Sequence, residues 1–163
     1  MSINGLRPRI SVFLMVHKNS LYKSLQFSDY TYMGDPLNAV RIFNDFGVDE
    51  LILMDIDASV NSLGPNFDLI SAIAQESRMP LCYGGGISNA FEVEKIVKAG
   101  VEKVSLSSQA IKNPKVIKSI AENFGSQSIS CCLDIKKPLK EKDYKAYIHN
   151  GMKKMEGDIL ETI

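Results

Sequence analysis

The feature that most constrains the fold of this chain is a regular alternation of short apolar runs and longer amphipathic stretches. Each apolar run is rich in β-branched residues, which predicts a β-strand. The stretches between the runs repeat apolar residues at every third or fourth position, which predicts helices with one buried face. We therefore expect four strand–helix units followed by a fifth strand. The predicted strands cover residues 9–16, 50–56, 80–83, 103–106 and 128–135.

Residues that favour helix ends stand at the expected boundaries. Proline has a fixed helical φ and is favoured in the first helical turn, so Asp35-Pro36 predicts a capped helix start. Asparagine side chains cap in the same way, and glycine commonly ends a helix because it readily adopts left-handed dihedrals. The other expected caps are Asn66 and Asn89, and the expected terminating glycines are Gly47, Gly100 and Gly125.

Near-continuous apolar strands joined by helices predict a parallel α/β sheet that is buried on both faces. The pattern alone leaves open whether the sheet is doubly wound or closed into a barrel. The first connection, residues 17–34, is long and polar with several aromatic residues, so we expect a loop on the active-site face. Residues 144–148 alternate like a small exposed strand, and residues 156–163 are expected to start a fifth helix.

Composition argues against several classes of function. Nineteen basic residues balance nineteen acidic ones, so the chain has no overall field to attract nucleic acid or an anionic membrane. The sequence contains no signal-peptide pattern and no apolar window of membrane length, and we expect a cytoplasmic protein with one domain over residues 1–163. Cys82, Cys131 and Cys132 lie in apolar runs and are expected to be buried thiols, with no metal site and no cofactor.

A glycine-rich turn is the first candidate binding site. Gly84, Gly85 and Gly86 lie between a predicted strand and a predicted helix, where backbone amides can approach a phosphate group closely. Ser107 and Ser108 follow the next strand, and their hydroxyl and amide groups would complete a cradle. The alternative is a tight turn whose dihedrals require glycine for structural reasons only.

Two aspartates at strand ends are candidate catalytic groups. Asp134 ends the fifth apolar run, and a carboxylate at the C-terminal end of a barrel strand is well placed for general acid–base chemistry. Asp55 holds the equivalent place on the second strand, with Lys23 or a serine as its expected partner. The alternative is that each aspartate merely caps a loop. His17 and His149 have no acidic neighbour at triad or metal spacing, and we expect both to be ordinary surface residues.

Four segments carry a family resemblance when they are read together, namely residues 47–56, 80–87, 101–108 and 124–128. In order and spacing they resemble the cyclase subunit of imidazole glycerol phosphate synthase, the HisF family. The resemblance implies a (β/α)8 TIM barrel, of which this chain would hold about the first five units. It also implies a lyase that takes ammonia from a glutaminase (HisH-like) subunit. The family converts a ribulosyl aminoimidazole nucleotide into imidazole glycerol phosphate and an aminoimidazole carboxamide ribotide in histidine biosynthesis.

The resemblance implies catalytic roles for individual residues. Asp134 matches the family's catalytic aspartate on the fifth strand, and Lys23 matches the lysine of its first loop. The family's first strand ends in Leu-Asp-Val, whereas this chain reads Leu14-Met15-Val16, so the second catalytic carboxylate is missing. Methionine cannot transfer a proton, and general acid–base help is worth roughly 10²- to 10⁴-fold in rate. The usual cyclisation is therefore placed in doubt at Met15.

Two further groups of residues match binding positions of the family. The group that matches its nearer phosphate site is Gly86, Ser107 and Ser108. The group that matches three of the four charged residues around the base of the barrel, where ammonia enters, is Arg9, Glu50 and Lys103. A purely stabilising role at that face is the alternative for the second group.

A side branch of the family fits the missing carboxylate better. Its members occur with a glutaminase homologue and an amidotransferase, and they are associated with ammonia delivery for acetamidino groups on surface-polysaccharide sugars. Residues 7–9, 32–43 and 65–67 resemble that branch. The sequence thus leaves three hypotheses: an ammonia-using cyclase, a cyclase-deficient scaffold that conducts ammonia to another acceptor, and a fragment without activity.

Overall fold

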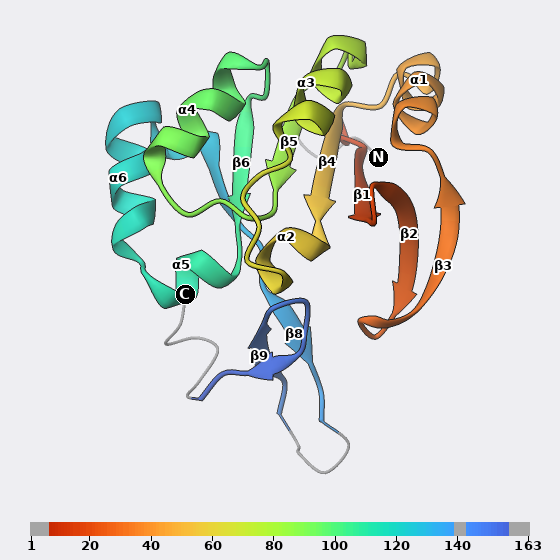
Figure 1. The fold of residues 1–163 in the computed structure, drawn as a ribbon. Helices are drawn as coiled ribbons and strands as arrows, with labels where there is room; N and C mark the ends of the chain where they lie inside the picture. Colours follow the sequence, from red (N-terminus) through yellow and green to blue (C-terminus); the bar gives the residue numbers. More distant parts are fainter. Residues whose placement is uncertain (1–6, 139–142, 157–163) are drawn as a thin grey trace.

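Figure 1 shows a computed structural model of the chain, which describes residues 7–138 and 143–156. Its main sheet has seven strands in the order β3-β2-β1-β4-β5-β6-β7. Five of them run parallel and lie side by side in chain order, whereas a doubly wound sheet reverses its strand order. The arrangement is therefore that of a barrel segment. The parallel strands are β1 (Ser11–His17), β4 (Glu50–Asp55), β5 (Leu81–Gly84), β6 (Lys103–Leu106) and β7 (Ile129–Cys131).

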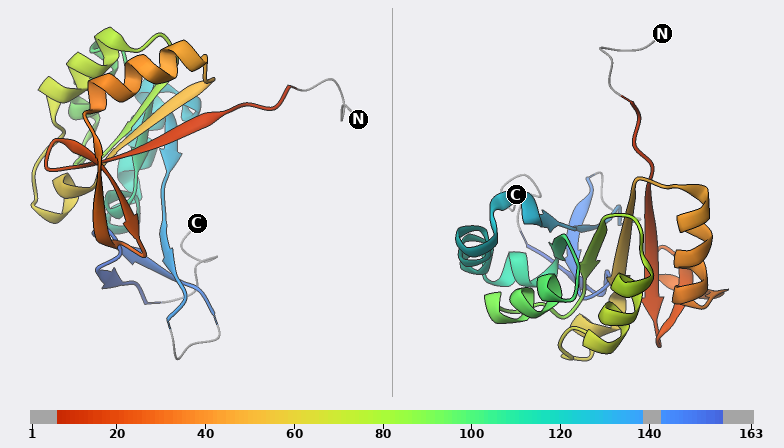
Figure 2. Two further views of the ribbon diagram at one scale, coloured as in Figure 1. Left: turned by 90° about the vertical axis from the view of Figure 1, so that its right-hand side faces the viewer. Right: turned by 90° about the horizontal axis from the view of Figure 1, so that it is seen from above.

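The long helices lie on one face of this sheet and follow it in an arc (Figure 2). They are α1 (Pro36–Phe46), α3 (Phe67–Glu76), α4 (Ala90–Lys98) and α6 (Lys115–Phe124). The side chains of Asp35, Asn66 and Asn89 accept hydrogen bonds from first-turn amides of the first three, as predicted. Two short helices, α2 (Ile56–Val60) and α5 (Ser108–Lys112), follow β4 and β6. No helix in the described part of the chain is long and apolar enough to cross a membrane.

Side chains alternate between the two faces of the sheet. Leu51 and Leu53 of β4 belong to the core that the helices cover, while Phe13 of β1 lies on the opposite face and is 54% exposed. The expectation that every strand is buried on both faces is therefore wrong for β1, although the middle strand β5 is buried along its whole length. Cys131, which we expected to be buried, is exposed because β7 forms an edge of the sheet.

The first connection is a two-stranded ribbon and not the loop that the sequence suggests. Strand β2 (Ser20–Leu25) pairs antiparallel with β1 and with β3 (Ser28–Gly34), so the ribbon extends the sheet beyond β1. The turn at Lys18-Asn19 has positive φ at both residues, which suits the twist of a tight hairpin. The strands were difficult to predict because β3 is almost entirely exposed and has no apolar alternation.

The predicted fifth strand is broken after β7, where the chain enters a second, antiparallel sheet at the carboxyl ends of the parallel strands (Figure 1). The strands of this sheet are β8 (Asp134–Lys136), β9 (Lys145–Ile148) and β10 (Lys153–Lys154). Asp134 thus begins β8 instead of ending the fifth parallel strand. The strand expected at residues 144–148 is present as β9, but its Ala146 and Ile148 are buried rather than exposed. The expected fifth helix lies, apart from Glu156, outside the described residues.

Candidate active site

A cavity that is open to solvent lies beyond the carboxyl ends of the parallel strands. Its walls come from the segments that follow β4, β5, β6 and β7, and from the turn between β9 and β10. Four segments that are distant in the sequence therefore meet at one place, as parallel strands require. The residues proposed from the sequence that line this cavity are Asp55, Gly85, Gly86, Ser107, Ser108 and Asp134.

Asp134 is a partly buried carboxyl group in the wall of this cavity. Burial raises its pKa above the usual value, while a hydrogen bond from the Gly151 amide and the charge of Lys136 act in the opposite direction. The Gly151 nitrogen lies 2.9 Å from Asp134 Oδ2, and Lys136 Nζ donates to the Gly151 carbonyl at 2.6 Å. A raised pKa favours the neutral acid, which is the form that can donate a proton.

Asp55 faces the same cavity and also caps helix α2. Its Oδ1 accepts hydrogen bonds from the amides of Asp57 at 3.0 Å and Ala58 at 3.2 Å. Burial raises the pKa of Asp55, and these two bonds oppose the rise. The expectation that Lys23 or a serine is its partner is wrong, because backbone amides fill that place. The capping alternative therefore accounts for one of the two carboxylate oxygens.

The glycine-rich turn is closely packed. A Cβ atom at Gly85 would lie 2.5 Å from the Asp55 carbonyl oxygen, and one at Gly86 would lie 2.6 Å from the Leu63 carbonyl oxygen. At Gly84 a Cβ would meet Met54 Sδ at 2.5 Å. Both Gly85 and Gly86 also have positive φ. Structural packing is therefore sufficient to require all three glycines, and their presence alone does not indicate a ligand.

Free backbone amides give a separate indication of an anion site. Across residues 7–138 and 143–156, the amides of Gly86, Ile87, Ser108 and Gln109 have no hydrogen-bond acceptor. All four residues line the cavity. Unpaired N–H groups of two loops that line one cavity are suited to the oxygens of a phosphate group.

Met15 and Lys23 are not part of this cavity wall. Met15 pairs with Met54 across β1 and β4, and its sulfur accepts a weak contact from the Ser24 hydroxyl at 4.0 Å. Lys23 is exposed on β2, opposite Thr31. The structure thus brings Asp134 and Asp55 together with the glycines and serines proposed for phosphate binding. It leaves Met15 and Lys23 outside the cavity wall.

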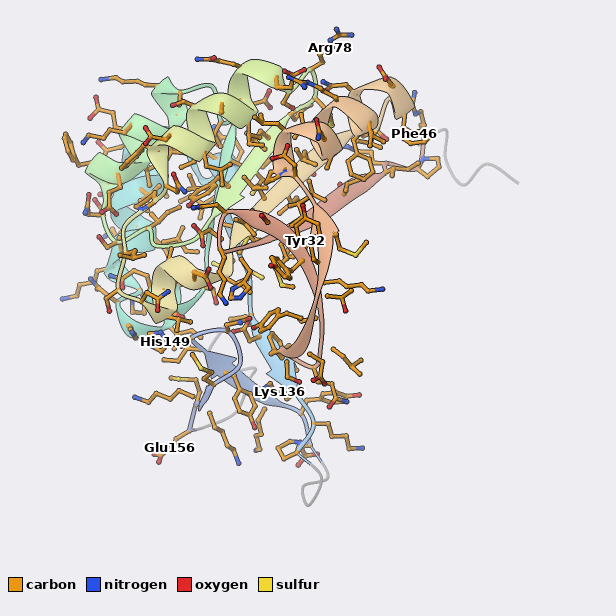
Figure 3. All side chains as sticks on the ribbon, turned by 45° about the vertical axis from the view of Figure 1, so that its right-hand side comes forward. Tyr32, Phe46, Arg78, Lys136, His149 and Glu156 are labelled. Carbon is orange, nitrogen blue, oxygen red and sulfur yellow. The ribbon has the colours of Figure 1, made fainter. Side chains whose placement is uncertain are left out.

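A charged cluster lies at the other end of the sheet, where the parallel strands begin. Lys103 Nζ donates to Glu50 Oε1 at 2.8 Å, and the Ser11 hydroxyl donates to Glu50 Oε2 at 3.0 Å. The bond from Lys103 is the main cause of a lowered pKa at Glu50, and the charge of Arg9 adds to it. In Figure 3, Phe46 and Arg78 mark this end, whereas Lys136 and His149 mark the cavity end.

Both histidines, which we expected to be ordinary surface residues, are half-buried and contact residues distant in the sequence. His17 Nδ1 lies 2.7 Å from Asp57 Oδ1, and its ring stacks on Tyr30 at 4.7 Å. The backbone amide of His149 donates to the Ser108 hydroxyl at 3.0 Å. The Asn150-Gly151 dipeptide is typical of hairpin turns, so the sequence did indicate a turn beside His149, but it did not indicate the contact with Ser108.

Comparison with known proteins identifies the family. Residues 16–163 match the model of the family described as histidine biosynthesis protein. The chain belongs to that family. A Leptospira borgpetersenii protein, provisionally named imidazole glycerol phosphate synthase subunit HisF, is 50% identical over 158 residues, which cover 97% of this chain and 62% of that protein.

Two further relatives carry the same subunit name. A Pseudomonas aeruginosa protein, also named provisionally, is 42% identical over 156 residues, with 96% of this chain and 62% of the relative covered. The HisF subunit of an Exiguobacterium species is 34% identical over 149 residues, which are 91% of this chain and 58% of that protein. The chain spans about three fifths of the length of these relatives. Its parallel strands are thus a segment of the TIM barrel typical of the histidine biosynthesis protein family.

Proposed function

We propose that this chain is part of a HisF-like cyclase subunit that uses ammonia from a glutaminase partner to act on a phosphorylated small molecule, as a lyase of the imidazole glycerol phosphate synthase type. The observation that carries the proposal is the cavity that combines Asp134 with four free amides. A proton donor beside an anion cradle is what chemistry on a phosphorylated substrate requires. Family membership and the names of the relatives favour the same activity.

The arrangement of charges supports a division of labour between the two ends of the sheet. Arg9, Glu50 and Lys103 would form part of the gate and of the glutaminase-binding face, since they lie where the parallel strands begin. Ammonia admitted there would follow the face away from the helices toward the cavity. Asp134 in its neutral form would then donate a proton to the reacting substrate, with Asp55 as a second carboxyl group in the same wall.

Met15 supports a second candidate function. A methionine occupies the place of the family's other catalytic carboxylate, and its nearest polar contact is the Ser24 hydroxyl. Such a protein would bind and activate a glutaminase, and would deliver ammonia to an acceptor on another protein. The acceptor reaction in this alternative is acetamidino-sugar formation for surface polysaccharide.

The proposal is tested with the protein encoded by the whole gene, supplied with ammonium salt and a ribulosyl aminoimidazole nucleotide. We expect imidazole glycerol phosphate to form, and Asp134→Asn to lower its rate by about 100-fold or more, because an amide cannot donate the proton. Asp45→Asn, an exposed change on α1, is the control and should leave the rate unchanged. Wild-type protein that forms no product but stimulates a bound glutaminase would support the second candidate.

A further inference from the structure

A second cavity, also open to solvent, adjoins the first. The two cavities share five lining residues: Ser59, Gly86, Ile87, Ser108 and Gln109. Four of these five carry the free amides, so the anion cradle lies on the boundary between the cavities. An anion bound by these amides is therefore within reach of side chains on both sides.

Lys112 is the one lysine or arginine that lines either cavity, as far as the structure describes the chain. It lies four residues after Ser108 on α5, and side chains at this spacing share a helix face and lean toward its N-terminus. Its ammonium group is 2.8 Å from His149 Nε2, and it takes part in no ion pair among the described residues.

The partners of His149 fix its tautomer. Nδ1 lies 3.1 Å from the Ser59 carbonyl oxygen, which can only accept, so Nδ1 carries the hydrogen. Nε2 faces the Lys112 ammonium, which can only donate, so Nε2 is the acceptor in this contact. His149 therefore holds a cation at the rim of the cradle without neutralising it.

A phosphate group in this cradle needs a compensating positive charge. Among the described residues, the lining of the first cavity includes two carboxyl groups, Asp55 and Asp134, and no lysine or arginine. The second cavity contains one carboxylate, Glu92, whose Oε2 accepts two hydrogen bonds from Ser88, from the amide at 2.7 Å and from the hydroxyl at 3.0 Å. Those bonds satisfy the carboxylate locally, whereas Lys112 has no anionic partner within residues 7–138 and 143–156.

We infer that Lys112 is a ligand of the substrate's phosphate group and that His149 is the residue that positions its ammonium group. The phosphate would occupy the boundary between the cavities and accept hydrogen bonds from the free amides. It would also accept a charge-assisted hydrogen bond from the Lys112 ammonium, in place of the bond that this group makes to His149 Nε2. This inference rests on the proposed function for the presence of a phosphorylated substrate, but the phosphate site itself can be measured without turnover.

The test measures binding of inorganic phosphate and of glycerol phosphate to the full-length protein by calorimetry and phosphorus NMR. Lys112→Met removes the charge and keeps the length of the side chain. We expect it to weaken binding of both probes by about tenfold, the usual worth of a hydrogen bond to a charged group. His149→Asn should weaken binding less, and the KM of any substrate turnover should rise in Lys112→Met while kcat changes little.

Lys118→Met is the matched control, because Lys118 lies on α6 outside both cavities and pairs with Glu122. Equal phosphate affinity in wild type, Lys112→Met and Lys118→Met would overturn the inference and leave the proposed function standing. Absence of any phosphate binding by the wild type would overturn both the inference and the proposed phosphate cradle. Lys112-dependent binding without ammonia-dependent turnover would support the inference and count against the cyclase.

Discussion

At the scale of single residues, Met15 separates the two candidate functions. It sits on β1 beside Met54 of β4 and is opposite Tyr22 of the ribbon. Its strand neighbours are thus a methionine and a tyrosine, and its sulfur accepts a weak contact from the Ser24 hydroxyl. A carboxylate at position 15 would lie near the carboxyl ends of the parallel strands, at the same level as Gly84 and Ser105. The scaffold around the position is intact, so the missing group is the deficit that can be restored.

Met15→Asp should raise ammonia-dependent cyclase turnover if the chemistry needs carboxyl groups on both β1 and the segment after β7. We expect a gain of at least about tenfold, since a positioned acid or base contributes roughly 10²- to 10⁴-fold. Steady-state rates of the full-length protein measure the effect. Met15→Asn is the control, because asparagine has the same shape as aspartate but transfers no proton. It should give no gain in turnover. Robust turnover by the wild type would show that Met15 does not disable cyclisation.

The roles of single residues could be predicted from the sequence where one local rule was sufficient. Asp35, Asn66 and Asn89 cap their helices because the capping geometry depends only on the next three residues. The roles of Gly85 and Asp55 could not be predicted from such a local rule. Each contacts the other, since a Cβ at Gly85 would meet the Asp55 backbone, and that contact depends on the pairing of two distant strands.

At the scale of elements, the ribbon and the second sheet are joined above the cavity. Lys136 Nζ lies 4.8 Å from the ring centre of Phe27 and 5.1 Å from that of Tyr147. The Asn150 amide donates to the Tyr30 hydroxyl at 2.6 Å. The contacts of Lys136 with Phe27 and of Asn150 with Tyr30 link residues more than a hundred positions apart, so no sequence periodicity could reveal them. The parallel strands and long helices were predictable because their own apolar spacing records the face they bury.

Gly151 is the residue on which this junction depends most. It has φ of 69°, and a Cβ there would meet Lys136 Cε at 2.6 Å and Phe27 Cγ at 2.7 Å. Gly151→Ala should therefore loosen the second sheet and release Asp134 from the Gly151 amide. We expect it to destabilise the protein by about 1 kcal/mol more than the positive φ alone would. Urea unfolding and hydrogen exchange of residues 145–148 measure the two effects.

Gly47→Ala is the matched control, because Gly47 has a similar φ of 64° with nothing within 4 Å of an added Cβ. It should lose only the dihedral term, roughly 1 kcal/mol, and leave exchange in residues 145–148 unchanged. Equal losses of stability in the two variants, with no faster exchange in β9, would contradict the importance assigned to the contacts of Gly151.

At the scale of the whole molecule, the sheet is covered by helices on one face and open on the other. The family resemblance implied a barrel segment, in which the first and last parallel strands, β1 and β7, would both lack a neighbouring strand; this holds only in part. Residues Met15–His17 of β1 pair with β2, so the ribbon protects the C-terminal half of that edge. This protection of the β1 edge was not predicted, because the segment that forms the ribbon was expected to be a loop. The edge of β7 has no partner strand among the described residues.

An open apolar face and an unpaired strand edge predict that the 163-residue chain, expressed alone, associates with itself. Phe13, 54% exposed on the face away from the helices, is the probe for that surface. We expect sedimentation velocity to show concentration-dependent oligomers, and Phe13→Asp to shift the population toward monomer. Phe46→Asp is the control, because Phe46 is 75% exposed at the end of α1, on the helical side. A wild-type chain that remains monomeric and unfolds cooperatively at high concentration would mean that the exposed face is stable in water, and that the ribbon and helices suffice to isolate this part of the barrel.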